Sequence, residues 1–350
     1  MGYDRISALP DHLITEILLW LLTGDSVKTS LLSTRWRNLW LDVPGLDFKL
    51  PFTNTKASFI ERFLEFNRDA RLRKFKLTYH RCKPNKGHPF GIREWIATAI
   101  SRGAQHLEVV EIFDTSLKNK LEFMPLDIYK SKTLVSLNLV RVGMSDPDFV
   151  VFLPCLKNMY LEQIMCSGKD PSFMEKLISG CPVLEGLTVS RSFDDNVLVL
   201  RVRSKSLKRF SVWSDWIGTN GREFALEIDA PGLKYMDLGD HLSQRIVVKN
   251  LRSLFMIDID SIFNAGSDTN LKMKKDAIGD FLNGISRVRH MIISQYTMEV
   301  FNRYLGSIPT FNNLYRLEAS CNTSCNTHLL QVLPDFLESF PNLRHLTLCT

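Results

Sequence analysis

The chain has 350 residues, 45% hydrophobic and 23% charged, and its formal net charge is +6. This length allows two domains with a sizeable core, and because no run of about 18 apolar residues exists we expect no membrane span. The seven cysteines are irregularly spaced, which is typical of reduced thiols in a nuclear and/or cytoplasmic protein rather than of a disulfide framework.

Residues 9–44 predict three short helices. Pro10 suits a first helical position, and apolar residues recur at helical spacing as far as Leu22, so the first helix is expected to end at Gly24. Ser33 can cap a third helix that begins near Trp36. A segment this short cannot bury all its own apolar surface, so it needs a partner, either the rest of the chain or another protein.

The order of residues in this segment resembles the F-box of plant F-box proteins. The matching residues are Leu9-Pro10-Asp11, Leu13, Glu16-Ile17-Leu18, Asp25, Val27, Thr29-Ser30, Leu32-Ser33, Arg35-Trp36-Arg37, Leu39-Trp40 and Val43-Pro44. Leu22 stands where relatives often have proline, and we expect it to lengthen the first helix slightly.

The resemblance implies docking onto a Skp-type adaptor that bridges to a cullin-based ubiquitin ligase. The residues that it implies for docking are Leu9, Pro10, Leu13, Ile17, Leu18, Val27, Leu31, Leu32, Trp36 and Leu39. Some of these must instead hold the three helices together, and the sequence does not sort them.

A six-residue phrase, with leucine or valine first and apolar residues fourth and sixth, recurs through the rest of the chain. Its eleven copies begin at residues 72, 107, 134, 156, 184, 207, 233, 251, 288, 314 and 343. The mean spacing of about 27 residues is typical of leucine-rich repeats. We expect the fourth and sixth positions to point inward from parallel strands and the third and fifth outward. Helices are expected between strands over 171–182, 274–285, 297–308 and 328–341.

Phrases such as LPCLKNMYL, GCPVLEGLTV and FPNLRHLTL also resemble the repeats of plant F-box proteins. Together the two resemblances imply an α/β protein of the F-box/FBD/LRR-like family. A three-helix F-box over residues 1–50 is expected to precede an irregular leucine-rich-repeat solenoid with a parallel β-sheet over residues 51–350. Relatives often carry an FBD segment after a phrase like LESFPNLRHLTL, so that segment is expected to be absent here. We then expect a poorly protected C-terminal sheet edge.

The outward positions of the strands would line the concave face of a curved solenoid. They include Val109 and Glu111 in the second copy and Ser253 and Phe255 in the eighth. Exposed aromatic side chains and arginines dominate interface energies. The target-binding residues predicted on this ground are Tyr160, Arg209, Trp213, Tyr235 and Phe255. A second interpretation, that these are singly exposed aromatics of no special role, stays open.

Other features carry less functional signal. Residues 60–90 hold nine basic and three acidic residues, a charge that can attract nucleic acid, although no nucleic-acid-binding motif accompanies it and a solvated face is favoured. Polar loops around 80–89 and 264–270 are candidate binding insertions. Cys321, Cys325 and His328 supply too few ligands for zinc, so no metal is expected.

No phosphate-binding loop, nucleophile elbow or metalloprotease motif is present, so neither catalysis nor a cofactor is expected. The sequence therefore predicts a non-catalytic substrate-recognition subunit of a Skp–cullin–F-box type E3 ubiquitin ligase. Its predicted partners are the Skp-type adaptor with its cullin complex and a target protein. The alternative is a ligase-independent repeat scaffold that binds protein or nucleic acid. A small-molecule co-ligand, used by some related plant receptors, has no signature here.

Overall fold

The computed structural model describes residues 5–50, 57–66, 71–80, 91–112, 121–167, 172–192, 196–214, 222–263, 271–305, 308–320, 333–334 and 336–349. The chain divides into two compact units, residues 1–156 (unit 1) and 157–350 (unit 2). The predicted boundary after residue 50 follows sequence pattern rather than compactness and remains a prediction. Among the described residues no helix is long and apolar enough to cross a membrane.

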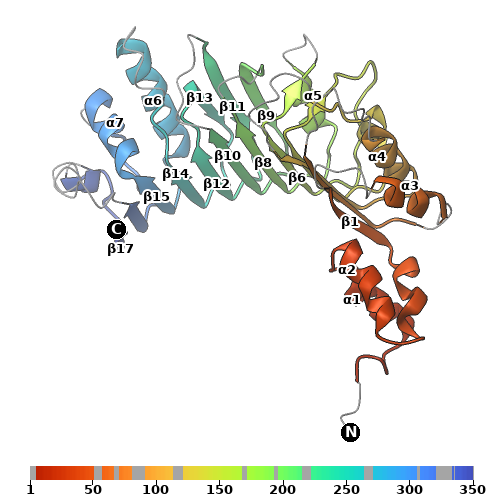
Figure 1. The fold of residues 1–350 in the computed structure, drawn as a ribbon. Coiled ribbons are helices and arrows are strands. Elements are labelled where there is room, and N and C mark those ends of the chain that lie inside the picture. Colours follow the sequence, from red (N-terminus) through yellow and green to blue (C-terminus); the bar gives the residue numbers. More distant parts are fainter. Residues whose placement is uncertain are drawn as a thin grey trace. The chain divides into compact units, whose positions relative to one another are not determined.

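Unit 1 begins with short helices (Figure 1). They are α1 (Asp11–Leu18), α2 (Thr23–Lys28) and the 3₁₀-helices η1 (Thr29–Leu31) and η2 (Trp36–Asp42). The predicted first helix was too long, because α1 ends at Leu18 and Gly24 lies inside α2. Leu22 precedes α2 with φ −58° and ψ 141°, an extended conformation that proline also adopts. Leu22 therefore does not lengthen α1.

Four parallel strands of unit 1 follow in the order β1 (Gly45–Leu50), β2 (Lys74–His80), β3 (His106–Ile112) and β4 (Ser136–Val140). The other elements of unit 1 are α3 (Ala57–Phe66), α4 (Ile92–Ser101), η5 (Leu126–Lys130) and β5 (Gly143–Met144). Strand β1 is a further copy of the repeat that the sequence analysis missed. Val43, Leu46 and Phe48 have the spacing of the repeated phrase, and all three are buried.

Unit 2 contains two layers. Eight strands of the main sheet pair in parallel in the order β6 (Asn158–Glu162), β8 (Gly186–Arg191), β10 (Arg209–Ser214), β12 (Tyr235–Gly239), β14 (Met256–Ile259), β15 (His290–Ser294), β16 (Arg316–Ser320) and β17 (His345–Cys349). Figure 1 shows an outer layer on one side of these strands. It consists of α5 (Phe173–Ser179), α6 (Leu271–Ile285), α7 (Gln295–Leu305) and a parallel sheet of β9 (Val199–Arg203), β11 (Phe224–Asp229) and β13 (Ser243–Lys249); β7 (Met165–Cys166) is a short strand.

The predicted α/β class, with parallel repeat strands, is confirmed. Three of the four expected helices are present as α5, α6 and α7. Of the fourth, 328–341, residues 333–334 and 336–337 are helical, while 328–332 and 335 lie outside the described residues. The sheet of β9, β11 and β13 was not predicted. Its three strands lie in the chain between β8 and β14, one in each successive interval between strands of the main sheet.

Two of the eleven copies were placed three residues out of register. In the second copy Leu107 and Val109 are the inward pair, so Val109 is not an outward residue. Glu111 is also buried, and it accepts a hydrogen bond from the Tyr79 hydroxyl at 3.2 Å. The third and fifth, outward positions of this copy are therefore His106 and Glu108.

The eighth copy has the same error. Ile257 and Ile259 are fully buried, so the phrase begins at Leu254 rather than at residue 251. The outward residues of β14 are therefore Met256 and Asp258, and Ser253 and Phe255 lie before the strand. In both copies an apolar residue three positions from the true first residue of the phrase was taken as that first residue, because it gives the same spacing.

A buried polar network closes the carboxyl ends of the central strands of unit 2. The Ser214 hydroxyl donates to Asp240 Oδ1 at 3.1 Å, and the Ser261 hydroxyl donates to the backbone carbonyl of Asp240 at 2.5 Å. The Thr297 Oγ1 accepts the backbone N–H of Ser261 at 2.8 Å. These bonds satisfy backbone groups where the strands end inside the protein, a place where unpaired groups are costly.

Candidate functional site

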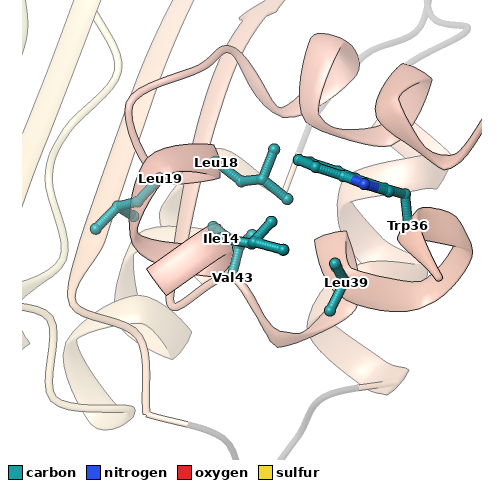
Figure 2. Packing of buried hydrophobic residues seen from close by; sticks show 6 residues of the cluster. All are labelled: Ile14, Leu18, Leu19, Trp36, Leu39 and Val43. Atoms are coloured by element: carbon teal, nitrogen blue, oxygen red, sulfur yellow. The ribbon is translucent and has the colours of Figure 1, made fainter. Parts of the chain in front are cut away.

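The N-terminal helices share one small apolar core, shown in Figure 2. Its buried members are Ile14, Leu18, Leu19, Trp36, Leu39 and Val43, and Leu9 packs against it. The members come from α1, η2 and the residues that follow each of these helices. The core therefore holds the helices together, and the helix faces that do not contribute to it are exposed to solvent.

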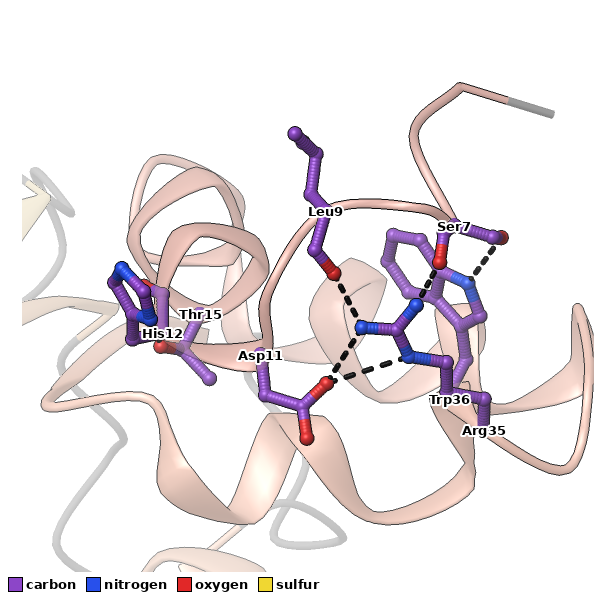
Figure 3. A network of polar contacts seen from close by, with 7 residues as sticks. All are labelled: Ser7, Leu9, Asp11, His12, Thr15, Arg35 and Trp36. Carbon is purple, nitrogen blue, oxygen red and sulfur yellow. Dashed lines mark hydrogen bonds and ion pairs between the residues drawn. The ribbon is translucent and has the colours of Figure 1, made fainter.

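Arg35 fixes the segment that leads into α1, as Figure 3 shows. Its guanidinium donates to Asp11 Oδ1 at 2.8 Å and to the backbone carbonyls of Ser7 and Leu9. The neighbouring Trp36 donates its indole N–H to the Ser7 hydroxyl at 2.8 Å. Because the fork of an arginine can hold several acceptors at once, this one side chain sets the path of the backbone through Leu9.

The helices are also tied to the first strands of unit 1. Arg73, just before β2, forms two hydrogen bonds with Glu16 of α1, at 2.7 and 2.9 Å. The Thr23 hydroxyl accepts the backbone N–H of Asp47 in β1 at 2.8 Å. A Cβ at Gly45 would lie 2.3 Å from a methyl carbon of Leu19 and 3.1 Å from the Cβ of Lys74, so Leu19 packs against a position that carries no side chain. The helices thus form a positioned body rather than a loose extension.

Exposed apolar side chains are concentrated in this helical segment. Eight of the 21 exposed large hydrophobic residues of the described chain lie between residues 6 and 32. Trp20, Leu31 and Leu32 are 83%, 86% and 68% exposed. The others are Ile6, Leu13, Ile17, Leu21 and Leu22. Exposed apolar surface on this scale is typical of a protein–protein interaction site.

The structure divides the ten residues predicted for docking into two groups. Pro10, Leu13, Ile17, Leu31 and Leu32 are exposed, and Leu9 and Val27 are partly exposed. Leu18, Trp36 and Leu39 are buried in the helical core, so they lie where they support the surface rather than on it. The role of all ten in docking stays a prediction.

Trp20 was missed as a surface residue. Its indole is largely exposed because α1 ends at Leu18, and tight turn bonds from Trp20 N–H to Ile17 and from Leu21 N–H to Leu18 redirect the chain. The signal in the sequence was a tryptophan that does not share the periodicity of Ile14 and Leu18. A large aromatic residue off the apolar face of a helix has no core to enter.

Unit 2 carries the residues predicted for target binding on the outward face of its main sheet. Tyr160 lies on β6, Arg209 and Trp213 on β10 and Tyr235 on β12, and all four are exposed. Phe255 is half-buried before β14 and contacts Tyr235 with ring centroids 6.3 Å apart. These positions follow neighbouring strands, except that β8 intervenes between β6 and β10. Their contact with a target stays a prediction.

The absence of a side chain at Gly239 lets the Trp213 ring lie against the sheet. Gly239 is opposite Trp213 in the register of β10 and β12, and a Cβ at Gly239 would lie 2.8 Å from the indole. The ring therefore lies over the bare backbone of the next strand. Trp213 keeps 46% of its surface exposed in this position, so it offers one flat apolar face above the sheet.

Carboxylates lie beside these aromatic side chains. Asp237 of β12 pairs in register with Asp258 of β14. Burial, together with the charges of Asp258 and Asp260, raises the pKa of Asp237 to about 7. Burial likewise raises the pKa of Asp258. Glu318 on β16 is paired at 2.8 Å with His290 and at 2.9 Å with Arg316. Because these carboxylates lie close together, the surface formed by β12, β14 and β16 favours bound protons and cations over anions.

The basic segment of unit 1 is largely neutralised where the structure describes it. Lys74 lies 2.9 Å from Asp47, and Lys76 lies 2.8 Å from Glu108. The hydrogen bond to Glu108 raises the pKa of Lys76. With Arg73 bound to Glu16, three of the five basic side chains in the described part of residues 60–90 are paired with carboxylates.

The remaining sequence signals fall mainly outside the described residues. These include residues 81–90, the loop 264–270 and the CNTSC segment with Cys321 and Cys325. Within the described ranges no group of three or more His, Cys, Asp or Glu side chains could hold a metal ion.

Comparisons with known proteins agree with this division. The F-box domain model matches residues 6–47, and the model for the LRR repeats of the FBD-associated F-box protein At5g56370 matches residues 92–258. Putative F-box/FBD/LRR-repeat protein At5g44950 of Arabidopsis thaliana is 49% identical over 364 residues, which cover 99% of this chain and 79% of the relative. F-box/LRR-repeat protein 13 of the same plant is 41% identical over 353 residues, covering 98% and 76%. The chain therefore belongs to the plant F-box/LRR-repeat family.

Proposed function

We propose that this protein is the substrate-recognition subunit of a Skp–cullin–F-box type E3 ubiquitin ligase. An F-box joined to leucine-rich repeats suggests a substrate-recognition adaptor of non-catalytic type. The observation that carries the proposal is the exposed apolar surface of Trp20, Leu31 and Leu32 on helices that have a separate, closed core. Such a surface fits an apolar partner, and an F-box generally implies a Skp-type adaptor.

The packing of the F-box explains how it can serve as a docking body. Each exposed leucine or tryptophan that becomes fully buried can contribute roughly 1.5–3 kcal/mol. Because the helices are already ordered by their core and by Arg35, little further conformational entropy is lost on binding. The adaptor would then bridge this chain to the cullin complex.

The repeats of unit 2 supply the second half of the proposal. Trp213, Tyr235 and Tyr160 offer exposed aromatic surface, with Arg209 and Phe255 beside them. The adjacent Asp237 and Asp258 match a target segment that carries apolar and basic side chains. The mechanism is proximity: holding target and ubiquitin-charged enzyme together raises their effective concentration, and no residue of this chain need perform chemistry. We place this activity in the nucleus and/or cytoplasm.

Co-expression with a Skp-type adaptor tests the proposal. The wild-type chain is expected to co-purify with the adaptor, and a Leu31→Ala, Leu32→Ala double variant is expected to lose it. Val150→Ala removes an equally exposed apolar side chain in unit 1 outside the F-box (87% exposed) and serves as the matched control. Failure of a folded wild-type chain to bind the adaptor would remove the ligase role and leave the helices as an internal cap.

A further inference from the structure

The outward face of the main sheet in unit 2 changes from aromatic to acidic along the sheet. Its exposed aromatic side chains are Tyr160 on β6, Trp213 on β10 and Tyr235 on β12. Carboxylates begin on β12, where Asp237 is in register with Asp258 of β14. The pairing of β10, β12 and β14 therefore places exposed aromatic rings and carboxylates next to one another on one face.

One row of residues across three strands joins the two parts of this face. The Trp213 ring lies over Gly239, which is its register partner on β12. The backbone N–H of Asp260 donates to the carbonyl of Leu238 at 2.9 Å, so the pairing of β14 with β12 continues by one residue and brings Asp260 next to Gly239. Neighbouring strands are about 4.8 Å apart, so Asp260 is two strand spacings, about 10 Å, from the strand that carries Trp213. No side chain of β12 separates them in this row.

Three carboxylates of this face have no counter-ion. In the part of the chain that the structure describes, the side chains of Asp237, Asp258 and Asp260 form no ion pair and no hydrogen bond. Oδ1 of Asp260 is buried there without a partner. Glu318 on β16, by contrast, is paired with basic side chains. The unpaired negative charge is therefore concentrated at the carboxyl ends of β12 and β14, beside Trp213.

This arrangement is costly in the isolated chain. Like charges opposite one another on neighbouring strands destabilise a sheet, and partly buried carboxylates lose hydration without gaining hydrogen bonds. A lysine ammonium or an arginine guanidinium supplies both the opposite charge and several N–H donors. The aliphatic stem of either side chain can also cover apolar surface, and its charged head is attracted to the face of an aromatic ring.

We propose that the outward face from β10 to β14 binds a target segment in which a lysine or arginine lies beside an aromatic or large aliphatic residue. The basic side chain binds among Asp237, Asp258 and Asp260, and the apolar one packs on Trp213. This inference rests on the target-binding part of the proposed function and names the chemistry that the repeats select. An anionic partner such as nucleic acid is repelled by the same carboxylates.

The test selects random displayed peptides on the purified 350-residue chain at pH 8, where Asp237 is ionised. A parallel selection uses the Asp237→Asn, Asp258→Asn double variant, which keeps the shapes of both side chains. Peptides selected on wild type are expected to contain lysine or arginine next to an aromatic or aliphatic residue. Peptides selected on the double variant are expected to show no such excess.

The best wild-type peptide is then synthesised and its affinity is measured. The double variant is expected to bind it at least about tenfold more weakly, and added salt should weaken the wild-type complex. Trp213→Ala, at an exposed position, should also weaken binding, because it removes the apolar contact. Asp148→Asn in unit 1, also exposed, is the matched control and should leave the affinity unchanged. Replacing the lysine or arginine of the peptide by norleucine should abolish the difference between wild type and the double variant.

Two results would overturn the inference. The first is an equal content of basic residues in the peptides selected on the two proteins. The second is a selected peptide that binds the double variant as tightly as it binds wild type. Adaptor co-purification, measured on the same preparations, separates this inference from the ligase role. A chain that binds the adaptor without selecting basic peptides contradicts this inference alone, whereas one that selects basic peptides without binding the adaptor contradicts the ligase role alone.

Discussion

Replacing Asp237 by Asn is expected to stabilise the protein at pH 8 and to have little effect at pH 4. The pKa of Asp237 is about 7 in the folded protein against an ordinary 3.8, because the carboxylate is partly buried beside Asp258 and Asp260. Between these two values the folded protein keeps a proton that the unfolded chain has released. The free energy of unfolding therefore falls as the pH rises from about 4 to about 7, and then stays low.

The size of the effect follows from the same two values. At pH 8 the full difference corresponds to about 4 kcal/mol. Because Asp237 is only partly buried and solvent screens it, we expect about half of this, roughly 2 kcal/mol. Asparagine has nearly the same shape and no charge, so the variant should gain this amount at pH 8. A gain of 2 kcal/mol corresponds to a rise of about 4–8 °C in melting temperature.

The assay is urea and thermal unfolding of wild type and Asp237→Asn at several pH values from 4 to 8. The quantity of interest is the difference between the two proteins at each pH, since titration of other groups then cancels. Asp148→Asn, at an exposed position, is the matched control. A difference that is constant across this pH range, or a variant that is less stable than wild type at pH 8, would refute the reasoning.

Three further substitutions test the packing of the two units. Ile14→Ala removes a fully buried side chain of the F-box core and should lower the free energy of unfolding by about 2–4 kcal/mol. Leu31→Ala, at an exposed position, should change it by less than about 0.5 kcal/mol. Equal losses in the two variants would contradict the division into core and surface. Gly45→Ala places a methyl group against Leu19 and should lower the melting temperature, and an unchanged value would show that the approach is not tight. Thr297→Val removes the hydroxyl that bridges β14 and α7 and should cost about 1–3 kcal/mol, a loss that Thr297→Ser should largely avoid.

The sequence located the N-terminal helices and most strands of the main sheet, but not β1 or the sheet of β9, β11 and β13. The six-residue phrase, with apolar residues at its first, fourth and sixth positions, located most of these strands. It did so because the inward side chains of a parallel repeat recur at that spacing. The pattern failed where apolar residues also occupy outward positions. Val110 and Ile112 in β3 and the extra Leu251 before β14 imitate the inward pair, so only pairing with neighbouring strands fixes the register.

The candidate docking surface was predictable as a segment but not residue by residue. Ile14 and Leu18 repeat with the period of a helix, and so do Leu13 and Ile17, which face the other way. The sorting depends on where α1 ends, and Leu19, the residue after its end, packs at Gly45 of β1. A contact between residues distant in the sequence is not visible in helical periodicity.

The target-facing chemistry was the least predictable part. The raised pKa of Asp237 arises from its burial and from the charges of Asp258 in the next strand and of Asp260. The misplaced eighth copy had assigned Asp258 no outward position. Each strand alone contains one unremarkable aspartate. Only the register of β12 and β14 brings the two carboxylates together.

The most direct test of the central claim is the affinity of the purified protein for a purified Skp-type adaptor, measured by calorimetry for wild type and for the Leu31→Ala, Leu32→Ala variant. Circular dichroism and unfolding of both proteins establish that the variant is folded. The account predicts measurable binding by wild type and a dissociation constant at least about tenfold weaker for the variant. Equal affinities of two folded proteins, or no binding by wild type, would contradict it.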